Sequence, residues 1–255
     1  MSDAFAQILA AKQTRLSRGE YAAFGAAARP TDGAAFVASL REPGTRIVAE
    51  FKAKSPSAGE ILVGADGKVE SFALLYRRGH AAAISVVTEA DFFGGKPEWL
   101  SRAKSISGLP VLMKDFIVNE RQLDFAVSLG ADAVLLIVRA LGEKELATLR
   151  TAARERGLAA VVEAHGAVEI RQAAAVEPEV LGVNARDLTS FQTDLAALAA
   201  MGKEIPPGPV RLAESGIQTR ADIVLLRGAG FEAFLVGEAL LRAEDPEEAL
   251  RELRQ

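Results

Sequence analysis

The 255-residue sequence lacks cysteine and contains only two histidines, His80 and His165. Without cysteine the chain can form no disulfide, no thiolate nucleophile and no cysteine-based metal site. Two histidines are also too few for an ordinary zinc site. We therefore expect no bound metal.

Long apolar runs and concentrated basic segments are missing as well. No window approaches the roughly 20 apolar residues of a membrane span. The first segment, MSDAFAQILAAKQTRLSRGEY, has an acid where a secretory signal needs positive charge, and Gln7 and Lys12 interrupt its apolar stretch. Basic residues are spread along a chain of formal net charge −4, which argues against nucleic-acid binding. We expect a cytoplasmic protein that acts on a small molecule, with no nucleic-acid or membrane partner.

What the sequence does contain is eight short β-branched or apolar runs, separated by amphipathic segments. The runs are RIVAEF, AAISVVT, PVLMKD, DAVLLIV, AAVVEA, VLGVNA, VRLAES and AFLVG. Apolar strands separated by helices indicate a parallel sheet covered by helices. Eight successive units predict an α/β fold of the closed (β/α)8 TIM-barrel type. An open doubly wound sheet is disfavoured, because the first turn, KAKSPSAGE, contains no G-x-G-x-x-G motif.

Residues 1–46 precede the first run. They contain helix-like segments near 3–18 and 33–41, joined by GAAARPTDG. Some forty residues are too few to hold a core of their own. We expect a helical N-terminal extension at residues 1–46 and a single catalytic barrel at residues 47–255.

Polar residues appear where the apolar runs end. They are Glu50, Lys52, Thr88, Glu89, Lys114, Asp115, Glu163, Asn184, Arg186, Glu214 and Ser215. In a parallel barrel these ends share the face on which barrel enzymes build their sites. Glu50 and Lys52, two positions apart, lie on the same side of their strand and can face the cavity. Burying Lys52, Lys114 and Glu163 would be costly without a purpose, which marks them as functional candidates.

Other charged or titratable residues have a simpler interpretation. Lys54 and Glu89 are interpreted as solvated loop residues, as lone charges after a strand usually are. His165 follows the fifth run and is interpreted as a surface or loop residue. His80 stands at a helix end in RRGH and is interpreted as structural.

A phosphate site is predicted at the last two strand ends. ESGIQTR offers Ser215 and Gly216, and VGEALL offers Gly237 directly before a helix. Barrels bind phosphate at these positions, with backbone N–H groups that glycine makes accessible and with a helix N-terminus. Ser55 and Arg186 add a hydroxyl and a guanidinium.

Seven motifs, in order across residues 47–242, resemble the indole-3-glycerol phosphate synthase family of tryptophan biosynthesis. They are IVAEFKAKSPSAG, VLMKDFIV, GADAVLLIV, VVEAH, GVNARDL, AESGI and FLVGEALLR. The resemblance implies a carboxy-lyase that closes the indole ring of 1-(2-carboxyphenylamino)-1-deoxyribulose 5-phosphate, releasing carbon dioxide and water without a metal or organic cofactor. Ala58 and Ala185 depart from the family pattern, which bears on affinity more than on activity.

The resemblance also implies roles for individual residues. Lys114 is the general acid that protonates the substrate carbonyl, Glu163 assists dehydration, and Lys52 lies beside the substrate carboxylate; which lysine acts in which step stays open. The catalytic group further includes Glu50, Asn184 and Ser215. The implied substrate-binding residues are Glu214, Phe93, Phe116, Pro56 and Leu135. The implied phosphate ligands are Ser55, Arg186, Gly216, Gly237 and, through its backbone N–H, Glu238.

Three alternatives to this function stay open, as does the oligomeric state. In a Schiff-base aldolase, Lys114 would attack a sugar-phosphate carbonyl. A phosphoribosylanthranilate isomerase would share the barrel, but it needs neither the extension nor paired lysines. A barrel that only binds a phosphorylated metabolite or a partner protein would need none of Lys52, Lys114 and Glu163. Neighbouring lysines lower each other's proton affinity and nearby carboxylates raise it. The sequence therefore does not decide the direction in which the pKa values of Lys52 and Lys114 shift.

Overall fold

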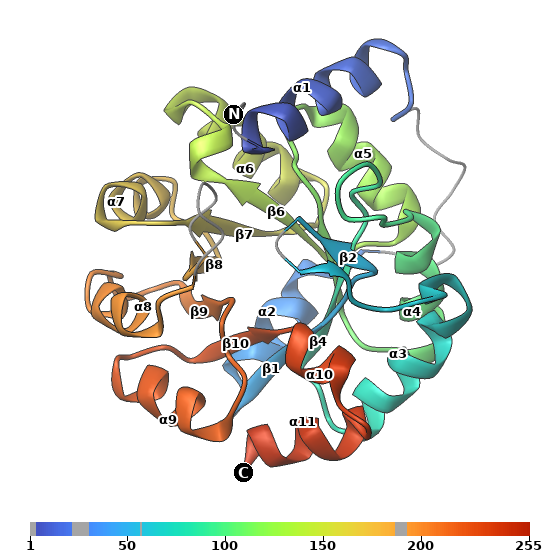
Figure 1. Cartoon of the computed structure of the whole chain (residues 1–255). Coiled ribbons are helices and arrows are strands. Elements are labelled where there is room, and N and C mark those ends of the chain that lie inside the picture. The colour runs from blue at the N-terminus through green and yellow to red at the C-terminus, as the bar shows by residue number, and fades with distance from the viewer. Residues whose placement is uncertain (1–3, 22–30, 57, 187–192) are drawn as a thin grey trace.

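The computed structural model describes residues 4–21, 31–56, 58–186 and 193–255, and within them eight parallel strands close into a barrel (Figure 1). The barrel strands are β1 (Arg46–Phe51), β4 (Ala83–Val87), β5 (Val111–Lys114), β6 (Ala133–Ile137), β7 (Ala159–Ala164), β8 (Val180–Asn184), β9 (Val210–Glu214) and β10 (Ala233–Val236). Closure comes from β1, which pairs with both β10 and β4. All eight predicted runs form strands, and the predicted (β/α)8 barrel is confirmed.

Helices surround the barrel in Figure 1. They are α3 (Val69–Arg78), α4 (Glu98–Ser107), α5 (Glu120–Leu129), α6 (Glu143–Glu155), α7 (Ala167–Ala175), α8 (Leu195–Gly202), α9 (Arg220–Gly228), α10 (Glu238–Arg242) and α11 (Pro246–Arg254), with short 3-10 turns η1 (Ala65–Lys68) and η2 (Val138–Ala140). Asn119, Asp194, Thr219 and Asp245 accept backbone N–H groups at the starts of α5, α8, α9 and α11, which fixes where these helices begin. No described helix is long and apolar enough to cross a membrane.

The helix α2 (Gly33–Arg41) closes the N-terminal end of the barrel. It contacts strands from several sides of the barrel and is visible through its centre in Figure 1. Phe36 and Leu40 are fully buried there, in one cluster with the interior side chains of Leu112, Val161 and Leu212. This apolar layer seals the bottom of the barrel and leaves the opposite end for the site.

The helix α1 (Ala4–Ser17) lies beside that opposite end, near the loops that follow β4 and β5. The Phe5 ring stands 6.0 Å from the Phe116 ring, and Lys12 Nζ lies 2.6 Å from Asp115 Oδ1. Most of the predicted connection between α1 and α2, residues 25–30, falls outside the described residues. A short antiparallel pair, β2 (Lys54–Ser55) with β3 (Gly59–Glu60), follows β1 near the mouth of the barrel.

Candidate active site

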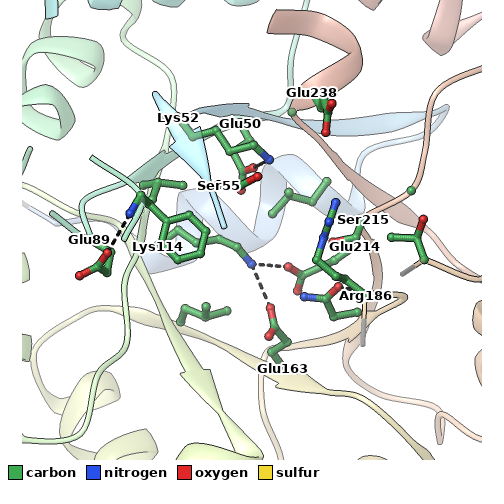
Figure 2. Close-up of a pocket in the computed structure, with 18 of the residues that line it drawn as sticks. Glu50, Lys52, Ser55, Glu89, Lys114, Glu163, Arg186, Glu214, Ser215 and Glu238 are labelled. Carbon is green, nitrogen blue, oxygen red and sulfur yellow. Dashed lines mark hydrogen bonds and ion pairs between the residues drawn. The ribbon is translucent and has the colours of Figure 1, made fainter. Parts of the chain in front are cut away.

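A cavity of about 300 Å³ opens at the C-terminal ends of the barrel strands. All sixteen site residues predicted from the sequence line it: Glu50, Lys52, Ser55, Pro56, Phe93, Lys114, Phe116, Leu135, Glu163, Asn184, Arg186, Glu214, Ser215, Gly216, Gly237 and Glu238. Figure 2 shows the charged members converging from different strands. The cavity therefore brings these candidates together.

Lys114 stands at the centre of the charged group. Its Nζ lies 3.0 Å from Glu163 Oε2 and 2.5 Å from Glu214 Oε2 (Figure 2). These three residues end β5, β7 and β9, and Glu50 lies in β1. The four strands alternate around the barrel, the pattern that places four side chains in one inward layer. The barrel geometry thus brings together residues far apart in sequence.

The pKa values in this layer follow from burial and from the balance of charge. Burial lowers the pKa of Lys114, but Glu163, Glu214 and Glu50 outweigh it and raise the pKa well above its usual range. Burial raises the pKa of Glu214 to about 8 against the attraction of Lys114. Burial also disfavours the charge of Glu163, yet the attraction of Lys114, with that of His165 when its imidazole is protonated, holds its pKa at about 2. The sequence leaves the direction of the lysine pKa shift open; in the structure the carboxylates raise the pKa of Lys114.

Lys52 forms a second ion pair at the same mouth. Its Nζ lies 2.6 Å from Glu50 Oε1, a contact that is possible because residues two positions apart in an extended chain share one side. Burial disfavours the charge of Glu50, but Lys52 and Lys114 overcome it and lower the pKa of that carboxyl. The five groups comprise three carboxyls and two ammonium groups, so one proton on Glu214 makes the set neutral near pH 7.

Two glycines give this charged group its space, and only one of them was expected from the sequence. A Cβ added at Gly182, on β8, would lie 2.2 Å from Glu214 Oε1. A Cβ added at Gly237 would lie 2.7 Å from Glu50 Oε1 and 3.2 Å from Lys52 Nζ. Any larger residue must displace a carboxylate. Gly182 was missed because the sequence does not indicate which side chain approaches it.

Aromatic rings form one wall of the cavity. The Phe93 and Phe116 rings lie 6.2 Å apart. Glu89 holds the loop that carries Phe93, since its carboxylate accepts the backbone N–H groups of residues 91–93 at 3.1, 2.7 and 3.0 Å. The interpretation of Glu89 as a solvated loop residue is therefore wrong: it is completely buried and organises the wall.

A buried lysine from outside the barrel supports the same wall. Lys12 of α1 is 1% exposed, and its Nζ lies 2.6 Å from Asp115 Oδ1, 3.6 Å from Glu89 Oε1 and 3.2 Å from the Tyr21 hydroxyl. Asp115 in turn accepts the Phe116 N–H at 2.7 Å. In the sequence Lys12 appears only as an interruption of an apolar stretch, because nothing there links it to residues some hundred positions away.

Four of the five predicted phosphate ligands, Arg186, Gly216, Gly237 and Glu238, follow the neighbouring strands β8, β9 and β10, whereas Ser55 lies on β2. Ser215 adopts a left-handed φ of 69°, and Gly216 follows it with φ 77°. Glu238 directs its carboxylate at Arg242 Nε, 2.9 Å away, in the first turn of α10. The backbone N–H groups in the first turn of a helix such as α10 have no acceptor within the helix. Asn184 Oδ1 accepts the N–H of Arg186 at 2.9 Å and so shapes the adjoining turn.

His165 is the clearest departure from the sequence-based interpretation. Its side chain is 2% exposed, not at the surface. Its Nε2 lies 3.4 Å from Glu163 Oε1, and its Nδ1 lies 3.4 Å from Glu169 Oε2. The lone position after a strand gave no sign that the imidazole turns inward, because its partner Glu169 belongs to the next helix, α7.

Comparison with known proteins identifies close relatives over nearly the whole chain. Residues 4–253 match the family described as indole-3-glycerol phosphate synthase. A protein of Ralstonia nicotianae named indole-3-glycerol phosphate synthase 2 is 40% identical over 227 residues, which cover 89% of this chain and 84% of the relative. A protein of Aromatoleum aromaticum named indole-3-glycerol phosphate synthase is 38% identical over 262 residues, which cover 99% of both chains.

Solved structures share the architecture at low identity. The 3-hexulose-6-phosphate synthase of Salmonella typhimurium has a TM-score of 0.63 and 18% identity, over 82% of this chain and 96% of that chain. The orotidine 5'-phosphate decarboxylase of Pyrococcus horikoshii has a TM-score of 0.61 and 15% identity, over 81% and 96%. At these identities the likeness supports the barrel fold alone.

Proposed function

Because the chain belongs to the indole-3-glycerol phosphate synthase family, we propose that Lys114, held between Glu163 and Glu214, is the general acid of its reaction. The enzyme is a carboxy-lyase of tryptophan biosynthesis: it closes the indole ring of 1-(2-carboxyphenylamino)-1-deoxyribulose 5-phosphate and releases carbon dioxide and water. The central position of Lys114, 3.0 and 2.5 Å from the two carboxylates, is the observation that carries the assignment.

We propose one orientation of the substrate in the cavity. Phe93 and Phe116 form an apolar wall for the anthranilate ring, with Pro56 and Leu135 as further lining. The phosphate then lies at the β8, β9 and β10 ends, near Arg186 and the backbone N–H groups of residues 216, 237 and 238, with the Ser55 hydroxyl opposite. Lys52 faces the substrate carboxylate. An apolar wall favours loss of that negative charge as carbon dioxide leaves.

Proton transfer starts at Lys114. The carboxylates around it keep the ammonium protonated, so it can stabilise negative charge that develops on the substrate carbonyl oxygen and then donate a proton to it. Once Lys114 is neutral, it no longer lowers the pKa of Glu163, and Glu163 becomes a stronger base. Glu163 is then ready to take a proton during dehydration, while Glu50, Asn184, Glu214 and Ser215 orient the reacting groups.

The same electrostatics argues against the aldolase alternative. A Schiff-base lysine attacks as the neutral amine. Two carboxylates in contact with Lys114 stabilise its protonated form instead, which suits a proton donor.

We also propose a cytoplasmic location, a small-molecule substrate with no nucleic-acid partner, and residues 1–46 as a helical extension of the barrel at 47–255. A sequence without cysteine fits the first point, and the spread of basic residues and the net charge of −4 support the second. The burial of α2 in the bottom of the barrel and of Lys12 beside its mouth supports the third.

The test follows indole fluorescence after the purified protein is mixed with the substrate. We expect Lys114→Ala and Glu163→Gln to lose about 100- to 10,000-fold in kcat, while Lys144→Ala, on the exposed side of α6, keeps wild-type activity. An active Lys114→Ala variant would refute the assignment of the acid. Borohydride trapping of a covalent adduct on Lys114 would instead establish the aldolase chemistry.

A further inference from the structure

The imidazole of His165 is a buried titratable group without a role in the proposed reaction. It lies behind Glu163, whose two carboxylate oxygens face different partners: Oε2 is 3.0 Å from Lys114 Nζ, and Oε1 is 3.4 Å from His165 Nε2. The His165 side chain is 2% exposed, and among the described residues its Nε2 makes no hydrogen bond. A buried ring nitrogen without a hydrogen bond carries a desolvation cost, which a proton shared with its neighbour would recover.

Glu169 fixes the orientation of this ring. Its Oε2 accepts the backbone N–H of His165 at 2.9 Å and lies 3.4 Å from the ring Nδ1. Its Oε1 lies 2.9 Å from Arg139 Nη2, so the carboxylate is held from two sides. A carboxylate beside Nδ1 selects the form with a proton on Nδ1. The lone pair of Nε2 then faces Glu163 Oε1. Both atoms are hydrogen-bond acceptors and repel each other, so the contact is attractive only when one proton lies between them.

We propose that His165 receives the proton that Glu163 takes from the substrate during dehydration, an inference that rests on the proposed role of Glu163. The proton bound to Glu163 Oε1 moves to the lone pair of His165 Nε2, which restores the Glu163 carboxylate and produces an imidazolium. Glu169 stabilises that cation through Nδ1–H. The proton returns by the reverse step, so the transfer needs no other reactant. The 3.4 Å separation shortens on transfer, as such contacts commonly do once substrate is bound.

Other charged groups near His165 bear on any pH measurement. Glu163 faces it from β7, and Glu169, paired with Arg139, faces it from α7. Three further charged residues, Arg186, Asp194 and Asp222, line the hollow beside the ring. Because these groups stay in place when only His165 is changed, the difference between wild type and variant reports on the imidazole.

The first test compares matched substitutions at the two histidines of the chain. We expect His165→Asn and His165→Gln to lower kcat about 10- to 100-fold, to leave KM within about twofold, and to remove one ionisation from the pH profile of kcat. His80→Asn, at an exposed turn, should match the wild type. Added imidazole should restore part of the kcat of His165→Ala, a gain that a purely structural role would not give.

The second test does not depend on activity. Nitrogen NMR of protein labelled with ¹⁵N-histidine contains signals from only two rings, and His80→Asn assigns them. We expect neutral His165 to carry its proton on Nδ1 and to lose that preference in Glu169→Gln. A proton on Nε2 in the neutral ring, or full kcat of His165→Asn at every pH, would overturn the proposal. In the latter case an inactive Glu163→Gln variant would leave the proposed function intact, whereas an active one would overturn both.

Discussion

Lys114 and Lys12 each lie within a few ångströms of two carboxylates, yet their surroundings differ. Lys114 pairs with Glu163 and Glu214 in the cavity, whereas the next residue, Asp115, which also lines the cavity, pairs with Lys12 of α1. Around Lys12 the carboxylates are also used by the backbone: Asp115 and Glu89 accept N–H groups of the loops after β5 and β4. Such a network holds structure in place.

The network around Lys114 is incomplete by comparison. Glu214 Oε1 is buried without a hydrogen bond within the described part of the chain, and three carboxyls compete for two ammonium groups. Burial, and then the charge of Glu163, raise the pKa of Glu214, which leaves a group that can change protonation. We therefore propose that the outer network, around Lys12, stabilises the wall and that the inner network, around Lys114, transfers protons.

The largest effect should follow the loss of the inner lysine. Lys114→Met keeps the volume of the side chain but has no proton to donate, and we expect kcat to fall about 1,000-fold. KM should change far less, because Lys52 and the phosphate-side groups remain. Steady-state kinetics by indole fluorescence measures both, and a kcat within tenfold of wild type would remove Lys114 from the chemistry.

The next effect should follow the loss of the outer lysine. Lys12→Met leaves Asp115 buried beside Glu89 without its cation, which costs about 3–5 kcal/mol of unfolding free energy. Urea denaturation followed by circular dichroism measures it. Adding Asp115→Asn to Lys12→Met removes the uncompensated charge and should recover part of the loss. An unchanged unfolding midpoint in Lys12→Met would show that the outer network contributes nothing.

A pH dependence of stability should distinguish the inner network further. The pKa of Glu214 is raised to about 8 in the folded state, so the folded protein binds a proton that the unfolded chain has already released above its ordinary value. The unfolding free energy should therefore fall as pH rises from about 5 to 8, by at most about 1.4 kcal/mol per pH unit from this group. Glu214→Gln should flatten that slope, and an unaltered slope would contradict the assignment.

The smallest effect concerns the space that Gly182 leaves for Glu214. Gly182→Ala places a methyl group 2.2 Å from the present position of Glu214 Oε1 and must displace the carboxylate. We expect kcat to fall about tenfold, roughly 1.4 kcal/mol in the barrier. Gly228→Ala in α9 is the matched control, because its added methyl meets nothing within 4 Å. Equal activity of the two variants would show that the Glu214 position is uncritical.

Much of this molecule could be predicted from its sequence, for a physical reason. Strands buried on both faces appear as apolar runs, and barrel closure places their polar ends, such as Lys114 and Glu163, at one mouth. The motifs at those ends also gave the correct family resemblance.

The remaining features depend on contacts that no local pattern encodes. Lys12 meets Asp115 across about a hundred residues, and His165 turns inward because Glu169 on the next helix fixes its ring. Glu89 looks like a lone loop charge until the three N–H groups it binds are seen. Each residue gains its importance from partners that only the folded chain supplies.

If the two adjacent lysine networks divide catalysis from stability, kcat and unfolding free energy of Lys114→Met and Lys12→Met, measured in the same buffer, will separate them. We predict that Lys114→Met shows the larger loss of kcat and Lys12→Met the larger loss of unfolding free energy. If Lys12→Met lost as much kcat as Lys114→Met, or Lys114→Met as much stability as Lys12→Met, the division would be contradicted.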